Sequence, residues 1–364
     1  MSHRAGRRAA IAAAVVVATV AVGLVASRAF HHDSRIEAAL DTLPSQTLVA
    51  NYTDWSAIRS ELGPDVSSRS ELKTRRDLFA EAYDRDYTTT SVLNVFDVDM
   101  ASAYGWTVLD SEWEMYGQSK DGAVDVLAMP DDFDFSAADE ALAKLGYGEP
   151  DENEVRVADD ETLASVASGL TPQLSAVAVL PDDGVIVMSD AAAYAGLAVR
   201  TIDGDEDSLL DEDAVAEMAA ALADSSVSAL LDAGDYACTA AGFGDADVGQ
   251  QDLARQRIDA AGGVSPTRAL ARSIDGSGQL TVVMVFDSGS TAEGELDPRV
   301  ALAQGEAPDQ GGTFEERFSI GSAEVDGSSV VMTLTPRSRD AQLLRDLGRG
   351  GLLFATCPIA DADN

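Results

Sequence analysis

The sequence predicts an α+β protein in which an N-terminal transmembrane helix precedes two similar α+β halves. Three observations lead to this prediction: an uncharged apolar run near the N-terminus, short alternating strands joined by Gly-containing turns, and helical patterns that end at glycine or proline. Strands joined as hairpins pair antiparallel. We therefore expect hairpin-built antiparallel sheets with helices packed on one face.

The N-terminal run covers residues 9–27, AAIAAAVVVATVAVGLVAS, and contains no charged side chain. As a helix it would be about 28 Å long, close to the thickness of a bilayer core. Three arginines precede it, and this positive charge places the N-terminus in the cytoplasm and the rest of the chain outside. The alternative is a signal peptide cleaved near residues 25–27, which would make the protein secreted.

The chain carries a net charge of −38 at pH 7 from 63 acidic and 25 basic residues. This excess excludes a general nucleic-acid binder, because such proteins use Lys and Arg to neutralise phosphates. We expect the membrane as a partner through the N-terminal helix, an envelope protein or the cell wall as a second partner, and no nucleic acid.

Both cysteines of the sequence, Cys238 and Cys357, follow the apolar run. Thiols oxidise outside the cytoplasm, and no other cysteine competes for either of them. We therefore predict a Cys238–Cys357 disulfide. The alternative is a pair of buried free thiols.

The chain divides into a signal or transmembrane segment (1–29), a juxtamembrane stalk (30–46) and two ectodomain halves (47–203 and 204–364). An acidic stretch that starts at Asp203 marks the boundary between the halves. Each half is interpreted as a strand and a helix followed by two hairpin-plus-helix units, although no sequence identity between the halves is visible.

The predicted elements of the first half follow apolar periodicity and cap residues. In the stalk, a short helix is expected from Ser34 to Leu43, stopped by Pro44. A helix capped by Thr53 or Asp54 should end at Gly63. The other first-half elements are strands at 47–52, 111–118, 123–129, 176–180 and 185–188, and helices at 68–83, 136–145 and 190–200.

The second half repeats this order of elements. Its hairpins are marked by turns that contain Asp-Gly, at 275–276 and 326–327. The predicted strands are 227–231, 267–274, 279–287, 317–325, 329–335 and 352–356, and the predicted helices are 248–261, 291–303 and 338–347.

All three histidines, His3, His31 and His32, lie in or beside the N-terminal segment. The two ectodomain halves, residues 47–364, therefore lack a histidine for Ser-His-Asp or Cys-His catalysis, for zinc ligation or for general-base chemistry. We predict no catalytic residue, no cofactor and no metal site, and we interpret the protein as a non-enzyme.

Three short sequence patterns would indicate a metal site or an enzyme instead. Four aspartates in the stretch 203–213 match positions 1, 3, 5 and 9 of a calcium loop, but Ser208 and Ala214 stand where the loop needs Gly and Glu. We favour a solvated acidic linker over calcium binding. Ser70 and Lys73 match the S-x-x-K pattern of penicillin-interacting enzymes, without the partner motifs of that class.

Glu112 and Glu114 flank Trp113 on a predicted strand and suggest the carboxylate pair of a glycosidase. Acids at alternate strand positions share one face of the sheet, and we interpret that face as solvated. The tryptophans are interpreted as core anchors rather than as a ligand platform; they are Trp55, Trp106 and Trp113.

Several short aromatic segments resemble those of uncharacterised membrane-anchored or secreted proteins of high-GC Gram-positive bacteria. They are NYTDW (51–55), GW (105–106), EWEMY (112–116), DYAC (235–238) and LFATC (353–357). The resemblance implies export and assigns no activity or functional residue.

From these observations we expect an extracytoplasmic, membrane-anchored binding or structural module of the cell envelope. Its location would be the cell membrane, with a single pass and a C-terminal ectodomain outside the cytoplasm. The alternative is an extracytoplasmic hydrolase that uses carboxylates, with or without a bound cation.

Overall fold

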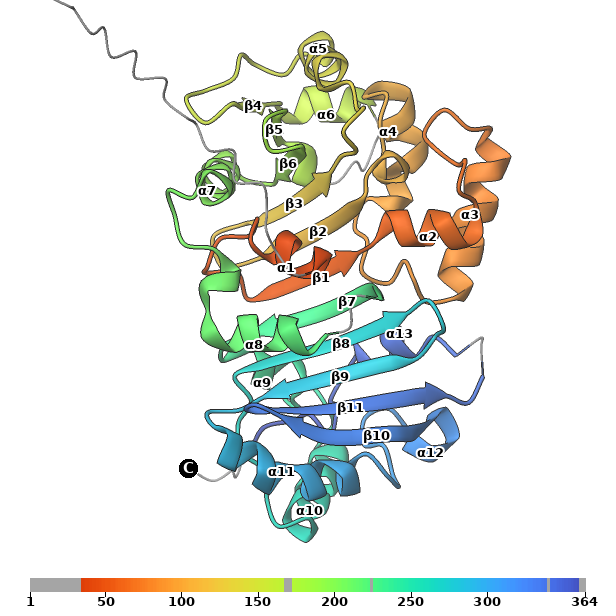
Figure 1. Ribbon diagram of the computed structural model, residues 1–364, viewed down its shortest axis with the longest axis vertical. Helices are drawn as coiled ribbons and strands as arrows, with labels where there is room; N and C mark the ends of the chain where they lie inside the picture. The colour runs from red at the N-terminus through yellow and green to blue at the C-terminus, as the bar shows by residue number, and fades with distance from the viewer. Residues whose placement is uncertain (1–33, 167–171, 223–224, 339–340, 360–364) are drawn as a thin grey trace, which may run out of the picture.

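The computed structural model describes residues 34–166, 172–222, 225–338 and 341–359 (Figure 1). The predicted transmembrane segment lies outside these residues. Among the residues described, none of the helices has the length and apolar character needed to cross a bilayer.

The centre of the fold is one antiparallel sheet of eleven strands, in the order β10-β11-β9-β8-β7-β1-β2-β3-β6-β5-β4. The strands are β1 (Val49–Thr53), β2 (Trp113–Gln118), β3 (Ala123–Ala128), β4 (Val155–Val157), β5 (Ala176–Leu180), β6 (Val185–Ser189), β7 (Ser226–Ala233), β8 (Ala269–Asp275), β9 (Leu280–Val285), β10 (Phe318–Asp326) and β11 (Ser329–Pro336).

Both faces of this sheet are buried. Along β6, Val185 and Val187 belong to one hydrophobic cluster, whereas Ile186 and Met188 belong to another. Successive side chains of a strand point to opposite faces, so the two clusters lie on the two sides of the sheet. We call the side that carries Val185 the first face and the other the second face.

The predicted arrangement of separate sheets with helices on one face is therefore wrong. The two halves share one sheet because β1 pairs with β7, with Asn51 opposite Leu230. Helices cover both faces because strands such as β6 and β9 are apolar along consecutive residues, which leaves neither side suited to water.

Among the described residues, three α-helices contribute to the cluster of the first face, and the other α-helices contribute to the cluster of the second face. Those of the first face are α1 (Arg35–Leu40), α7 (Ala192–Asp203) and α8 (Asp213–Ala221). Those of the second face are α2 (Trp55–Leu62), α3 (Leu72–Asp84), α4 (Asp97–Ala103), α5 (Phe135–Leu145), α6 (Asp160–Val166), α9 (Tyr236–Ala240), α10 (Val248–Ala260), α11 (Gly289–Leu302), α12 (Phe314–Arg317) and α13 (Leu343–Leu347).

The order of strands is the same on either side of the central β1–β7 pair. Outward from that pair, one series is β1-β2-β3-β6-β5 and the other is β7-β8-β9-β11-β10, with β4 added at the edge of the first. A first-face helix precedes each series, α1 before β1 and α8 before β7.

The predicted stalk is corrected in part. Ser34 caps α1, and its side chain accepts a hydrogen bond from the backbone N–H of Glu37, as a capping box requires. However, Ile36, Leu40 and Leu43 are buried in the cluster of the first face. Residues 35–43 are thus part of the folded body, because their apolar side chains pack on the sheet.

Most other predicted elements are confirmed, with ends shifted by a few residues. The predicted helix 136–145 begins one residue earlier, as α5, because the side chain of Asp134 caps it by accepting from the backbone N–H of Ala137. One detail was wrong. The predicted strand at 352–356 forms turns, in which the N–H of Ala355 donates to the carbonyl of Leu352.

Candidate functional site

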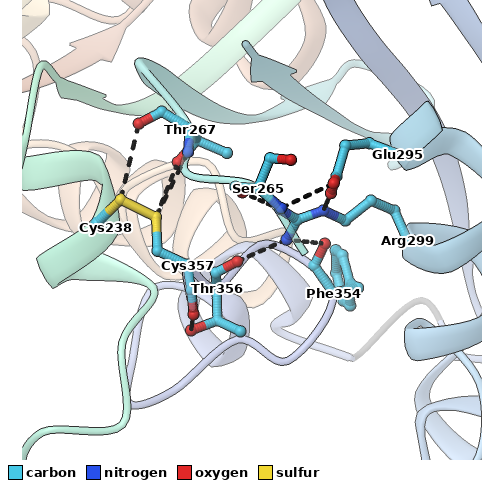
Figure 2. Close-up of polar contacts among 8 residues, drawn as sticks. All are labelled: Cys238, Ser265, Thr267, Glu295, Arg299, Phe354, Thr356 and Cys357. Carbon is cyan, nitrogen blue, oxygen red and sulfur yellow. Dashed lines mark hydrogen bonds and ion pairs between the residues drawn. A yellow bond between two sulfur atoms is a disulfide. The ribbon is translucent and has the colours of Figure 1, made fainter. Parts of the chain in front are cut away.

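The predicted disulfide between Cys238 and Cys357 is confirmed. It joins α9 to the C-terminal segment, residues 352–357, across a sequence separation of 119, with the two Cα atoms 5.2 Å apart. Figure 2 shows Thr267 beside the sulfurs, where its backbone N–H donates to Sγ of Cys357 at 3.4 Å. The bond therefore fixes the C-terminal segment against the second half of the sheet.

A buried arginine holds the same C-terminal segment (Figure 2). Arg299 on α11 is fully buried, and its guanidinium donates to the carbonyls of Thr356 at 2.6 Å, Phe354 at 3.3 Å and Ser265 at 2.7 Å. Its Nε donates to Glu295 one helical turn away, at 2.8 Å. Burial lowers the pKa of Arg299, and Glu295 opposes that effect. This cluster is a structural clamp, since its donors are used within the protein.

A concavity in the first half is lined by aromatic and charged side chains, and we call it the aromatic cavity. Its volume is about 610 Å³, within the range of about 300–1,000 Å³ common for small-molecule sites. Its walls come from helices and loops, with no β-strand residue among them. The lining residues are Arg59, Pro64, Asp65, Val66, Ser67, Arg69, Tyr104, Gly105, Trp106, Leu109, Asp110, Pro130, Asp132, Phe133, Asp134, Ala137 and Ala138.

The chain reversal after α4 brings two aromatic rings to this cavity. Gly105 has a φ of +79°, a left-handed conformation that glycine adopts without strain, and it lets Trp106 turn back toward Tyr104. The two ring centroids are 5.6 Å apart. The hydroxyl of Tyr104 lies 3.0 Å from that of Tyr147, which donates to the carbonyl of Leu174.

Some polar groups around the cavity serve the fold. Asp110 accepts from the backbone N–H groups of Ser68 and Thr107, at 3.1 and 2.9 Å. Arg59 donates to the carbonyl of Ser111 at 2.6 Å, and burial lowers the pKa of its guanidinium. These side chains fix the walls of the cavity.

Four other groups at the cavity have no partner among the described residues. Trp106 is only 1% exposed, yet its indole Nε1 has no hydrogen-bond acceptor there. The side chains of Arg69, Asp65 and Asp132 are exposed and form no ion pair or hydrogen bond within the described part of the chain. A buried indole N–H normally finds a partner, so that of Trp106 is an exception, and the exposed charged side chains are the groups that a ligand in the cavity could reach.

A second concavity, of about 720 Å³, lies between the two halves at the β8–β9 turn. Its polar groups bind one another. Arg85 pairs with both Glu61 and Glu81. The hydroxyl of Tyr87 lies 2.9 Å from the carbonyl of Gly276 and 3.1 Å from Glu61, and burial raises the pKa of Tyr87 to about 12. We therefore consider this cleft a junction between the halves.

A pair of carboxyl groups, Glu114 and Asp125, is fully buried on the second face of the sheet. Glu114 accepts three hydrogen bonds, from the indole of Trp55 at 2.8 Å and from the backbone N–H groups of Val92 and Leu93 at 2.8 and 3.1 Å. Within the described part of the chain, neither side-chain oxygen of Asp125 has a hydrogen-bond partner. Burial raises the pKa of both, and the nearby Glu114 raises that of Asp125 further. Glu114 is thus the ionised member and Asp125 the protonated one.

Replacing Asp125 by Asn should stabilise the protein at neutral and alkaline pH. In the unfolded chain Asp125 ionises near its ordinary pKa, whereas in the folded chain its raised pKa retains the proton. The free energy of unfolding therefore falls as pH rises above about 4, by about 1.4 kcal/mol per pH unit, until the raised pKa is passed. Asn mimics the protonated acid and cannot ionise.

Urea unfolding of Asp125→Asn and wild type at several pH values measures this difference. The variant should lose less stability than wild type as the pH increases. Asp121→Asn, an exposed change on the β2–β3 turn, is the matched control and should follow wild type. A variant that is less stable than wild type throughout this pH range would show that Asp125 is folded in its ionised form.

The structure separates the other residues that sequence patterns singled out. The S-x-x-K pattern is not assembled, because Lys73 pairs with Asp77. Glu112 lies near Arg35 at 3.5 Å and is partly exposed, while Glu114 is fully buried, so the prediction of a solvated acidic face was wrong for Glu114. The indole of Trp55 explains its burial, since it supplies a hydrogen bond to the carboxylate.

The acidic stretch that begins at Asp203 forms the end of a helix and the turns that follow it. Asp203 ends α7, Glu206 pairs with Arg200, and Asp211 accepts from the backbone N–H of Ser208 in a short 3-10 helix. Within the described residues, no three His, Cys, Asp or Glu side chains gather in a way that could hold a metal ion.

Sequence reasoning missed the aromatic cavity and Arg299. Trp106 was predicted to be a core residue, which its burial confirms, but its unmet N–H becomes visible only once its neighbours are placed. The spacing of Glu295 and Arg299 indicates an ordinary ion pair on a helix, and nothing in the local sequence marks it as buried.

No family model, curated protein or solved structure matches this chain. The functional argument therefore depends on the geometry of the site.

Proposed function

We propose that this protein is an extracytoplasmic binding module of the cell envelope and that the aromatic cavity is its ligand site. One observation carries the proposal: the cavity combines apolar walls with the exposed side chains of Arg69 and Asp132, which form no ion pair or hydrogen bond among the described residues. Sites for small molecules combine apolar walls with a few convergent polar groups, and this cavity has both.

The disulfide supports the placement outside the cytoplasm, because such bonds persist in oxidising compartments. The apolar run at residues 9–27 would hold the protein at the membrane in a single pass, with an envelope protein or the cell wall within reach. Protease added to intact spheroplasts should digest the folded body. Protection of that body until the membrane is lysed would contradict this orientation.

We also infer that the two halves, 47–203 and 204–364, are similar units. The shared strand order and the first-face helix that precedes each series support this inference. When the five strands of one half are superposed on the corresponding five strands of the other, the side chains on the first face in one half should match those on the first face in the other. A register offset of one residue in most pairs would contradict the inference.

The geometry favours a binding module over a carboxylate hydrolase. The neighbouring carboxyl pair Glu114 and Asp125 is fully buried and lines none of the cavities described above. A general acid must contact the group that it protonates, and these two carboxyls have no solvent-accessible surface.

Thermal unfolding of the full chain in detergent, against a panel of neutral oligosaccharides, short peptides and calcium chloride, tests the proposed function. One member of the panel should raise the unfolding midpoint, because a ligand at 100 times its Kd stabilises the folded state by about 2.7 kcal/mol. The shift should be absent in the double variant Arg69→Gln/Asp132→Asn. A shift that persists in the double variant would place binding elsewhere.

A further inference from the structure

We propose that the free edge of β10 binds an extended, basic segment of a protein partner, which pairs with it as one more antiparallel strand. β10 ends the sheet on the side of the second half (Figure 1). Along its outer edge, the backbone therefore has no strand to pair with among the described residues. This site is separate from the aromatic cavity, which lies in the first half.

The opposite end of the sheet shows how such a position is filled. Beyond the five strands that both series share, the first half adds β4, which pairs antiparallel with β5 and places Arg156 opposite Val177. The side chain of Arg156 donates to Asp139 on α5, at 2.6 and 2.9 Å. β10 holds the place of β5 in the second half, and no strand lies beyond it in the described part of the chain. The fold thus contains one example of a basic strand added at this position and one position left open.

Two backbone positions of β10 face outward. Asp326 and Ser329 flank the two-residue turn of the β10–β11 hairpin, and residues that flank such a turn form a hydrogen-bonded pair. Every second residue of β10 then directs its N–H and C=O toward β11, and the residues between direct theirs outward. Ala323 and Val325 are the outward residues next to the turn. Extended peptides bind exposed sheet edges through groups of this kind.

Unpaired acidic side chains flank this edge. Glu324 and Asp326 are exposed on β10, and neither forms an ion pair or hydrogen bond within the described residues. α11 packs on β10, and its exposed side carries Glu293 and Asp297, which have no partner in that part of the chain either. Complementary charges steer association and suppress wrong partners, so this edge selects a strand with basic side chains.

A second copy of this chain is the competing occupant, and its charge disfavours it. Each chain carries a net charge of −38, and two β10 strands paired with each other would bring their own acidic side chains together. The bulge between Ile320 and Ser322 also interrupts the register that a long self-paired edge needs. These features protect the edge against another copy and leave the stretch from Ser322 to Asp326 open to a basic strand.

Fluorescence anisotropy of a labelled peptide with the full chain in detergent tests the proposal. The probe is a short synthetic peptide in which valine alternates with lysine or arginine, and its control has glutamate at every basic position. We expect the basic peptide to bind, with an affinity that falls as salt is added, and the acidic peptide not to bind.

Amide hydrogen exchange shows whether the bound peptide pairs with the edge. At ten times its Kd, the basic peptide should slow exchange at the N–H groups of Ala323 and Val325 about tenfold, because the edge is then free only about a tenth of the time. The N–H groups of β10 that face β11 should change little, since they are already paired.

Variants of the edge provide a second readout. Ala323→Pro removes one outward N–H, a change that edge strands tolerate, and should weaken binding about tenfold. The double variant Glu324→Lys/Asp326→Lys reverses two exposed charges and should also weaken binding about tenfold. Its matched control is Glu152→Lys/Asp121→Lys, which reverses two charges at exposed sites of the first half and should bind like wild type.

Each result decides for or against a basic partner strand. Binding that leaves exchange at Ala323 and Val325 unchanged, or that the control variant weakens equally, would show general attraction to an acidic surface and overturn the proposal. A dimer in sedimentation velocity that Ala323→Pro dissociates would assign the edge to a second copy instead. Failure of the basic peptide to bind at low salt would also overturn the proposal, and none of these results bears on the aromatic cavity.

Discussion

Replacing Cys238 and Cys357 together by Ala should lower the free energy of unfolding by about 4–5 kcal/mol. The disulfide closes a loop of 119 residues, and a cross-link of that span removes much of the entropy of the unfolded chain. Folded stability is commonly about 5–15 kcal/mol, so this loss is a large fraction of the total.

Urea unfolding of oxidised wild type, reduced wild type and the double variant measures the effect. Reduced wild type should resemble the variant, and reductant should leave the variant unchanged. The expectation fails if the variant unfolds at the same urea concentration as oxidised wild type, since the bond would then contribute nothing to folded stability.

The second large effect is expected at Arg299. Arg299→Met keeps the length of the side chain but leaves the Glu295 carboxylate without its charged partner inside the protein. Removing one member of a buried ion pair typically costs about 3–5 kcal/mol. The carbonyls of Ser265, Phe354 and Thr356 lose their donors as well, so the C-terminal segment should loosen.

Two further variants are compared with Arg299→Met by urea unfolding. Arg299→Lys keeps the positive charge and the N–H donors of one ammonium group, so it should lose less stability than Arg299→Met. Arg268→Met removes an exposed pair with Asp287 and should cost below about 1 kcal/mol. Equal losses for Arg299→Met and Arg268→Met would contradict the clamp.

Both changes loosen the same C-terminal segment, so their effects should not add. Arg299 binds the carbonyl of Thr356, and Cys357 is the next residue. Once the disulfide is removed, the segment can detach in part, and the loss from Arg299→Met should be smaller. This dependence would place the two contacts in one structural unit.

The hairpins could be predicted from the sequence because their signals are local. Alternating residues at 329–335 and the turn at Asp326-Gly327 predicted β10 and β11, and the structure confirms both strands. The pairing of β1 with β7 joins segments far apart in the chain, so no local pattern indicated a single sheet. Consecutive apolar residues in β6 and β9 are consistent with burial on both faces, and this signal was overlooked.

The site was harder to predict because its parts come from separate segments. Arg59, Trp106 and Phe133 are brought together by packing of α2, the turn after α4 and the loop before α5. Arginine, tryptophan and phenylalanine occur in the core or on the surface of most folded proteins, so their presence in the sequence marks no site. The hollow that these segments enclose is a property of the packed structure and has no counterpart in the sequence.

The most direct test of the central claim is the indole N–H resonance of Trp106 in a proton–nitrogen correlation spectrum of the full chain. The Trp106→Phe variant assigns the resonance, and the indole of Trp55, which donates to buried Glu114, is an internal reference. Addition of the panel compound that raises the unfolding midpoint should shift the Trp106 resonance, because Trp106 lines the cavity, and leave that of Trp55 in place. An unchanged Trp106 resonance at concentrations that saturate the rise in midpoint would contradict the claim that the aromatic cavity is the ligand site.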